Sequence, residues 1–158
     1  MTLDELAKWF FVRRPRGRLR PPEWDSDWRA LLVGNLEILA NELSQVGIGE
    51  VYVNGSFVEA KDHPNDIDGY FVCDREEILS GRLERDLNRV STKPCWTWDN
   101  ADRRLVAGHG RKLPMWIEYR VELYPHFGQG TGLSTVSGTS FNSRRPFAGP
   151  APVNRRGS

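Results

Sequence analysis

Apolar residues recur at steps of three and four from residue 28 to residue 46, which predicts a long amphipathic helix. They are Trp28, Leu32, Leu36, Leu39, Leu43 and Val46. Asp25 or Ser26 precedes this pattern and can cap the first turn through its side-chain oxygen. Gly47 and Gly49 follow the last apolar position and are expected to end the helix.

Two shorter stretches have the same helical spacing, one over residues 3–12 and the other over residues 75–90. A capping box precedes each of them, and in the second stretch it consists of Asp74 and Glu77. We therefore expect three helices in the chain.

Segments rich in β-branched and aromatic residues predict strands over residues 50–55, 66–73 and 116–124. Residues 92–115 are mixed in character and rich in tryptophan, so we expect a long loop there, with room for one strand. After Pro125, core-forming residues become scarce and glycine, serine and proline common. This composition indicates a tail without structure of its own, unless a partner or the core fixes it.

The order of helix, strand, strand, helix and strand indicates an α/β or α+β fold, in which helices flank a small sheet. Loop 56–65 joins the first two strands and has room for only one turn of helix. A hairpin-like or mixed sheet is therefore favoured over a purely parallel one.

Charge is distributed unevenly along a chain of 158 residues whose formal net charge is only +1. Residues 1–20 hold six basic and two acidic side chains, a balance of +4, and residues 127–158 hold four basic side chains and no acidic one. The 12 basic and 19 acidic side chains between them give −7. An acidic centre between basic ends suggests a site that gathers cations.

Composition divides the chain into three parts. They are an N-terminal helix with an arginine-rich arm (1–22), a core domain (23–126) and a basic tail rich in glycine, serine and proline (127–158). The arm is a candidate for binding a polyanion such as RNA, or else a solvated extension. Its arginines are Arg13, Arg14, Arg16, Arg18 and Arg20.

Several protein classes are disfavoured by what the chain lacks. No apolar run approaches the length of roughly 18–20 residues that a membrane span needs. The N-terminus does not have the basic and apolar regions of a signal peptide. Cys73 and Cys95 cannot form a disulfide framework of the secreted kind. We expect a cytoplasmic protein that does not act on membranes.

Residues 53–71 carry the candidate chemistry. A strand runs into Gly55 and Ser56, and Asp66 and Asp68 begin the next strand. Residues two apart in a strand face the same side, so the two carboxylates project together and repel each other unless a cation lies between them. Oxygen ligands favour Mg²⁺, and a glycine-serine turn suits phosphate oxygens. Lys61 is either a further phosphate ligand or a solvated loop residue.

This segment resembles the signature of the nucleotidyltransferase superfamily related to DNA polymerase beta. The signature consists of an apolar strand, Gly-Ser, about ten residues, Asp-x-Asp and a third acid on a later strand. The likeness covers roughly residues 25–125 and is greatest to the small bacterial and phage-type members. Gly69 stands where that family usually has an aliphatic residue, which either weakens the strand or makes space for a ligand.

The third acid has two candidates, Glu118 and Glu122. They lie four residues apart, so both would point to one face of the predicted strand. Glu122 is favoured because its sequence surroundings look like the strand of the family that ends in a turn.

The resemblance implies transfer of a nucleoside monophosphate, most simply AMP, from an NTP to a hydroxyl of a protein or an RNA, with release of pyrophosphate. Asp66, Asp68 and Glu122 would hold two Mg²⁺ or Mn²⁺ ions, Glu122 would also accept the hydroxyl proton, and Gly55 and Ser56 would position the phosphates. A toxin–antitoxin or phage-defence setting fits the small members. The alternative is a catalytically silent module that keeps the fold and binds RNA or a protein partner.

Overall fold

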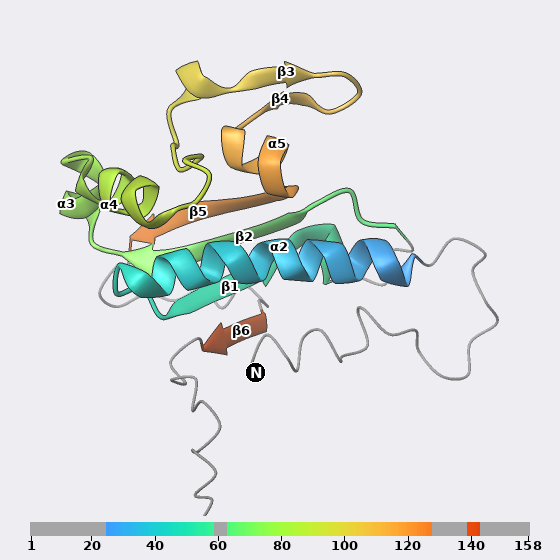
Figure 1. Ribbon diagram of the computed structural model, residues 1–158, viewed down its shortest axis with the longest axis horizontal. Coiled ribbons are helices and arrows are strands. Elements are labelled where there is room, and N and C mark those ends of the chain that lie inside the picture. The colour runs from blue at the N-terminus through green and yellow to red at the C-terminus, as the bar shows by residue number, and fades with distance from the viewer. Residues whose placement is uncertain (1–24, 59–62, 128–138, 143–158) are drawn as a thin grey trace, which may run out of the picture.

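The computed structural model of the protein describes residues 25–58, 63–127 and 139–142, and Figure 1 shows their arrangement. They form a four-stranded sheet in the order β5-β2-β1-β6 and a separate two-stranded hairpin. Helix α2 lies across one face of the larger sheet. A small α+β fold with helices flanking a mixed sheet is therefore confirmed. The expected helix over 3–12 lies outside the described residues.

Helix α2, Ser26–Gln45, follows the apolar spacing that predicted it. Asp25, not Ser26, is its N-cap, because the Asp25 carboxylate accepts a hydrogen bond of 2.8 Å from the backbone N–H of Trp28. Gly47 has a φ of +93° just beyond the end of the helix, a conformation that glycine adopts without strain. The buried stripe of the helix forms one core with the sheet. It includes Leu32, Leu36, Leu39 and Leu43.

The larger sheet is mixed. Strand β1, Glu50–Asn54, pairs antiparallel with β2, Ile67–Cys73, which pairs parallel with β5, Val121–Phe127. Strand β6, Thr139–Asn142, pairs antiparallel with β1 at the edge. The tail was expected to have no structure of its own unless a partner or the core fixed it, and for these four residues the sheet does so. Strand β5 continues through Pro125.

One face of the sheet is apolar and the other polar. The residues buried in the core are Val51, Val53, Ile67, Phe71, Val121 and Leu123. Gly69 lies among them, and a Cβ added there would stand 2.6 Å from the Tyr52 carbonyl oxygen and 2.9 Å from Leu123 Cδ2. Close packing of neighbouring chain, rather than space for a ligand, therefore accounts for this glycine. Asp68 and Glu122 belong to the opposite face.

The helix expected over 75–90 is broken into two. Helix α3 is Arg75–Leu79 and helix α4 is Arg82–Val90. Gly81, between them, has a φ of +65°, and a residue in this left-handed conformation interrupts a right-handed helix. Asp74 is the N-cap of α3 but makes no capping hydrogen bond through its side chain, so the expected capping box is wrong.

The stretch between α4 and β5 contains more structure than expected. A short 3-10 turn, η2 (Asn100–Asp102), precedes a hairpin of β3 (Arg104–Val106) and β4 (Gly110–Lys112). Helix α5, Pro114–Tyr119, follows. In Figure 1 the hairpin lies beyond α5, away from the larger sheet.

The strand predicted over 116–124 is wrong in its first half. Pro114 stands at the start of α5, where its fixed φ favours a helix, and Met115, Trp116 and Tyr119 are buried at helical spacing. Arg120, with a φ of +55°, ends the helix and lets β5 begin at the next residue.

Two findings bear on the protein class. None of the helices in the described ranges is long and apolar enough to cross a membrane. Cys73, half-buried, and Cys95, buried, are both free thiols.

Candidate active site

Three acidic side chains meet where β2 and β5 run side by side. Asp68 and Glu122 are partners in the parallel register of these strands, and Asp66 directly precedes β2. Asp66 and Asp68 are two residues apart, so an extended chain turns both toward one side. The sheet thus brings together the three acids that the sequence singled out, although residues 74–120 separate the two strands.

The glycine-serine turn lies against this cluster. Gly55, Ser56 and Phe57 form the 3-10 turn η1 directly after β1. Gly55 has a φ of +74°, and a Cβ added there would stand 3.0 Å from the Asp68 carboxylate oxygen Oδ2. The backbone of the turn and the carboxylate of the next strand are therefore in close contact, and Ser56, half-buried, belongs to the same turn.

The start of α2 holds this part of the site in place. Arg29 is fully buried, donates a hydrogen bond of 3.1 Å from Nη1 to the Phe57 carbonyl oxygen, and lies 5.2 Å from the Phe57 ring centre. The indole N–H of Trp28 donates a 2.7 Å hydrogen bond to the Pro64 carbonyl oxygen, two residues before Asp66. One helix end therefore anchors both the turn and the approach to the acids.

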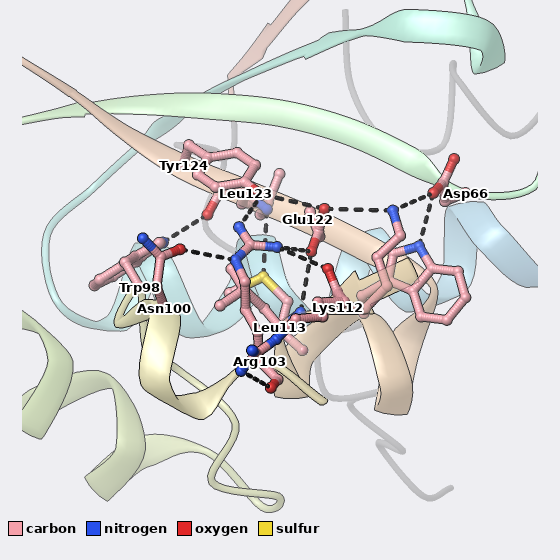
Figure 2. A network of polar contacts seen from close by, with 12 residues as sticks. Asp66, Trp98, Asn100, Arg103, Lys112, Leu113, Glu122, Leu123 and Tyr124 are labelled. Carbon is pink, nitrogen blue, oxygen red and sulfur yellow. Dashed lines mark hydrogen bonds and ion pairs between the residues drawn. The ribbon is translucent and has the colours of Figure 1, made fainter. Parts of the chain in front are cut away.

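Glu122 is the most enclosed of the three acids, with 6% of its side chain exposed. Its Oε1 accepts hydrogen bonds from the Leu113 backbone N–H (3.2 Å) and from Arg103 Nη1 (3.5 Å). Its Oε2 accepts one from the Tyr124 hydroxyl (3.1 Å) and lies 3.6 Å from Lys112 Nζ. Figure 2 shows these groups converging on the carboxylate.

Asp66 shares Lys112 with Glu122. The Lys112 ammonium lies 3.3 Å from Asp66 Oδ2, and the Trp116 indole N–H donates a 2.7 Å hydrogen bond to the same oxygen. Lys112 also lies 4.9 Å from the Trp116 ring centre, within the range of a cation–π contact. One ammonium group therefore bridges two of the three acids (Figure 2).

Asp68 differs from its neighbours because, in the part of the chain that the structure describes, its carboxylate takes part in no hydrogen bond or ion pair. Burial raises the pKa of Asp68, and the nearby charges of Asp66 and Glu122 raise it further, while Lys112 opposes them. Asp68, beside the Gly55 turn, is therefore the acid of the three whose negative charge the protein stabilises least by direct contacts.

The sequence did not point to four of the residues that surround the acids. They are Arg103, Lys112, Trp116 and Tyr124. Arg103 donates a 3.0 Å hydrogen bond to the Tyr124 hydroxyl, and this bond raises the pKa of the guanidinium above its ordinary value. Burial raises the pKa of the Tyr124 hydroxyl. Arg103, Lys112 and Trp116 reach the acids through the hairpin and α5, whose placement no local pattern predicted. Tyr124 lies on β5, two residues from Glu122. Arg29 did leave a signal, since it is a charged residue beside the apolar stripe of α2.

Glu118 is not an alternative third acid. It lies on α5 rather than on the strand of Glu122, its side chain is exposed, and its carboxylate pairs with Lys93 at 3.1 Å. The argument that both glutamates share one strand face is therefore wrong, because residues 116–119 are helical. Lys61 and the arginine-rich arm lie outside the described residues.

The carboxylates fit a hard cation in part. Asp66 and Asp68 offer oxygen atoms beside each other, the donor type that Mg²⁺ prefers, and Mg²⁺ commonly completes its shell with water and substrate phosphates. Across the described residues, however, no three aspartate, glutamate, histidine or cysteine side chains are arranged to hold a metal ion. The Glu122 carboxylate already forms ion pairs with Arg103 and Lys112. It could bind a metal ion only if one of these cationic side chains moved away.

Comparison with known proteins identifies a family for which no function is described. Neither the curated proteins nor the solved structures contain a match to the chain. A family model described as "Family of unknown function (DUF6932)" matches residues 1–145. This match includes the three acids, the Gly55 turn and the hairpin that carries Lys112. The chain therefore belongs to the DUF6932 family.

Proposed function

We propose that the protein is a Mg²⁺- or Mn²⁺-dependent nucleotidyltransferase that moves a nucleoside monophosphate, most simply AMP, from an NTP to a protein or RNA hydroxyl. The contact between the Gly55 turn and the Asp68 carboxylate is the observation that carries this proposal. It joins a turn suited to phosphate oxygens with a pair of acids suited to a cation, at one place on the sheet.

Each part of the site has a role in this reaction. Gly55 and Ser56 bind phosphate oxygens through backbone amides and the serine hydroxyl, and Arg29 keeps their turn rigid through the Phe57 carbonyl. Asp66 and Asp68 hold the metal. When bound, it supplies Lewis-acid stabilisation of the charge that builds on the phosphate oxygens.

The transfer itself exchanges one phosphorus–oxygen bond for another. The acceptor hydroxyl oxygen forms a bond to the α-phosphorus, the bond from that phosphorus to the bridging oxygen breaks, and pyrophosphate leaves. Asp68 is better placed than Glu122 to take the hydroxyl proton. Glu122 already accepts from several donors, whereas Asp68 has neither hydrogen bond nor ion pair in the described residues.

A second candidate function is supported by the neighbours of Glu122. Arg103 and Lys112 both neutralise this acid, so that the site as it stands lacks a free third carboxylate. In this alternative the protein binds nucleotide, RNA or a protein partner without transferring a nucleotide.

A label-transfer assay tests the proposal and separates it from the alternative. The full chain is incubated with each α-³²P-NTP, Mg²⁺ or Mn²⁺, and a cell extract as the source of acceptors. We expect label on a macromolecule, and digestion with ribonuclease or proteinase then identifies the kind of acceptor. The double variant Asp66→Asn with Asp68→Asn should lose transfer, while Glu118→Gln, a matched change of an exposed acid, should retain it. NTP binding without transfer would support the alternative. Absence of both would contradict the proposal and leave only binding of RNA or a protein partner.

A further inference from the structure

The two cations at the acid cluster are held very differently. Arg103 donates to the Asn100 side chain (3.1 Å), the Arg111 carbonyl oxygen (3.3 Å), the Tyr124 hydroxyl (3.0 Å) and Glu122 (3.5 Å). These four acceptors come from different parts of the chain and surround the planar guanidinium. Arg103 is therefore a fixed part of the framework around Glu122.

Lys112 is held loosely by comparison. Within the described ranges, its ammonium donates a single hydrogen bond, to Asp66 at 3.3 Å, and its contact with Glu122 is an ion pair of 3.6 Å. The side chain is 20% exposed, much as that of Arg103 is (21%), and the ammonium also lies 4.9 Å from the Trp116 ring centre. The difference between the two cations is therefore, among the described residues, the single hydrogen bond of Lys112 against the four of Arg103. Lysine carries its charge on a flexible four-carbon stem with rotatable donors, so the ammonium can move several ångströms while the backbone stays in place.

The backbone next to Lys112 is fixed, which confines any movement to the side chain. Leu113 is fully buried, and its N–H donates to Glu122. The hairpin on the other side of Lys112 is open to solvent, with Leu105 82% exposed. A swing of the lysine stem therefore disturbs neither the core nor the hydrogen bond of Leu113.

The position of Lys112 is also where a cation would join the acids. Its ammonium bridges Asp66 and Glu122, and a divalent ion bound to the same carboxylates would be repelled by it at short range. Lysine and metal therefore compete for the cluster. Phosphate oxygens at the neighbouring Gly55 turn would give the displaced ammonium a new anionic partner.

We propose that Lys112 is an exchangeable counter-ion, which occupies the cation position between Asp66 and Glu122 and moves to a phosphate oxygen when a metal-bound polyphosphate arrives. This inference rests on the proposed function and adds a substrate-binding residue to it. Free metal then binds the resting site only weakly, and it binds more tightly together with the triphosphate.

Two binding measurements on the full chain test this exchange. Lys112→Met keeps the length of the stem and its packing on Trp116 but removes the charge. We expect this variant to bind free Mn²⁺ at least about tenfold more tightly than the wild type, because a close like charge is removed. We expect the same variant to bind a non-hydrolysable NTP analogue with Mg²⁺ at least about tenfold more weakly, because a phosphate ligand is lost. Calorimetry measures both affinities.

Lys93→Met is the matched control, since Lys93 forms its 3.1 Å ion pair with Glu118 at an exposed place on the surface. It should change neither affinity. A Lys112→Met protein with unchanged or weaker Mn²⁺ affinity would overturn the proposal, because Lys112 would then be a permanent cross-link. An analogue affinity that Lys112→Met leaves unchanged would overturn it as well.

A measurement on the wild type guards against a misfolded variant. Lysine acetylation followed by mass spectrometry should show Lys112 reacting faster when Mn²⁺ is saturating and slower when the metal–NTP analogue is bound. Unchanged reactivity in both cases would contradict the exchange. If the analogue binds to neither protein, the proposed function fails, and the Mn²⁺ measurements still decide whether Lys112 competes with the metal.

Discussion

Gly55, directly after β1, lies so close to Asp68 on β2 that a Cβ added at Gly55 would stand 3.0 Å from Asp68 Oδ2. Glycine is required here for two separate reasons. The φ of +74° is costly for any residue with a Cβ, and the carboxylate leaves that atom little room. The turn and the acid are thus fitted to each other, and changes to one should be felt by the other.

Replacing Gly55 by alanine should lower the free energy of unfolding by more than the cost of the left-handed backbone alone, which is about 1–2 kcal/mol. Gly81→Ala provides the matched comparison, because Gly81 has a φ of +65° and nothing lies within 4 Å of an added Cβ. The difference between the two variants in chemical denaturation isolates the contact with Asp68. Equal losses in the two variants would show that this contact is not tight.

Asp68→Asn should stabilise the protein at neutral pH. The folded protein raises the pKa of Asp68 above its ordinary value of 3.8, so the folded state holds the proton more tightly than the unfolded chain does. Ionisation of Asp68 therefore costs stability, and this cost grows as the pH rises from 3.8 through the raised pKa. The advantage of Asp68→Asn should be present in full above the raised pKa and disappear below about pH 3.8 in urea denaturation.

Asp66→Asn, two residues away, should have the opposite effect and cost about 1 kcal/mol, because it weakens an acceptor of charge-assisted hydrogen bonds. Trp116 and Lys112 both donate to Asp66 Oδ2. Opposite changes in the free energy of unfolding for two acids this close could not result from a general loss of negative charge. The same sign in both variants would contradict the assignment of their partners.

Arg29→Met should lower the free energy of unfolding by about 1–3 kcal/mol, since it leaves the Phe57 carbonyl oxygen without this buried donor. If the proposed function holds, NTP affinity should fall as well, because the turn is no longer anchored. Arg82→Met removes an exposed arginine that pairs with Glu77 and should stay within about 0.5 kcal/mol of the wild type. Thermal and chemical denaturation measure both variants.

The arginine-rich arm should confer salt-dependent RNA binding. Contacts to phosphates release counterions, so binding by the wild type should fall at least about tenfold between 50 and 200 mM salt. Replacing the five arginines of the arm by glutamine should flatten this dependence and spare nucleotide binding at Asp66 and Asp68. Filter binding or fluorescence anisotropy reads out both. Weak and salt-insensitive binding by the wild type would remove RNA as a partner of the arm. The arginines are Arg13, Arg14, Arg16, Arg18 and Arg20.

Local patterns were sufficient to predict α2, β1 and β2, because each has an apolar periodicity that agrees with its buried face. They failed at residues 116–119, where alternating large and polar residues also suit a short helix once Pro114 starts it. They failed again at β6, whose four residues become a strand only because β1 offers an edge to pair with.

The candidate site, like the fold, could be predicted only where its residues lie within one local segment. Asp66 and Asp68 follow from a spacing within one segment, whereas Glu122 was favoured only because its surroundings resemble a strand of the nucleotidyltransferase signature. The register of β2 and β5 then places Glu122 beside Asp68. Lys112 could not be found in this way, because it lies 46 residues from Asp66 in the chain and reaches it only through the fold of the hairpin. Glu118 shows the same limit, since a change from strand to helix removed it from the site.

The parallel pairing of β2 and β5 has a consequence for how the molecule folds. Parallel neighbours require a crossover, and here residues 74–120 form it. Asp68 and Glu122 therefore become neighbours only when this long segment closes, and that closure would be opposed by like charge. Arg103 and Lys112 belong to the closing segment itself and arrive beside Glu122 together with its strand. Closure and neutralisation therefore coincide, so the chain brings its own counter-charge at the step at which β5 joins the sheet.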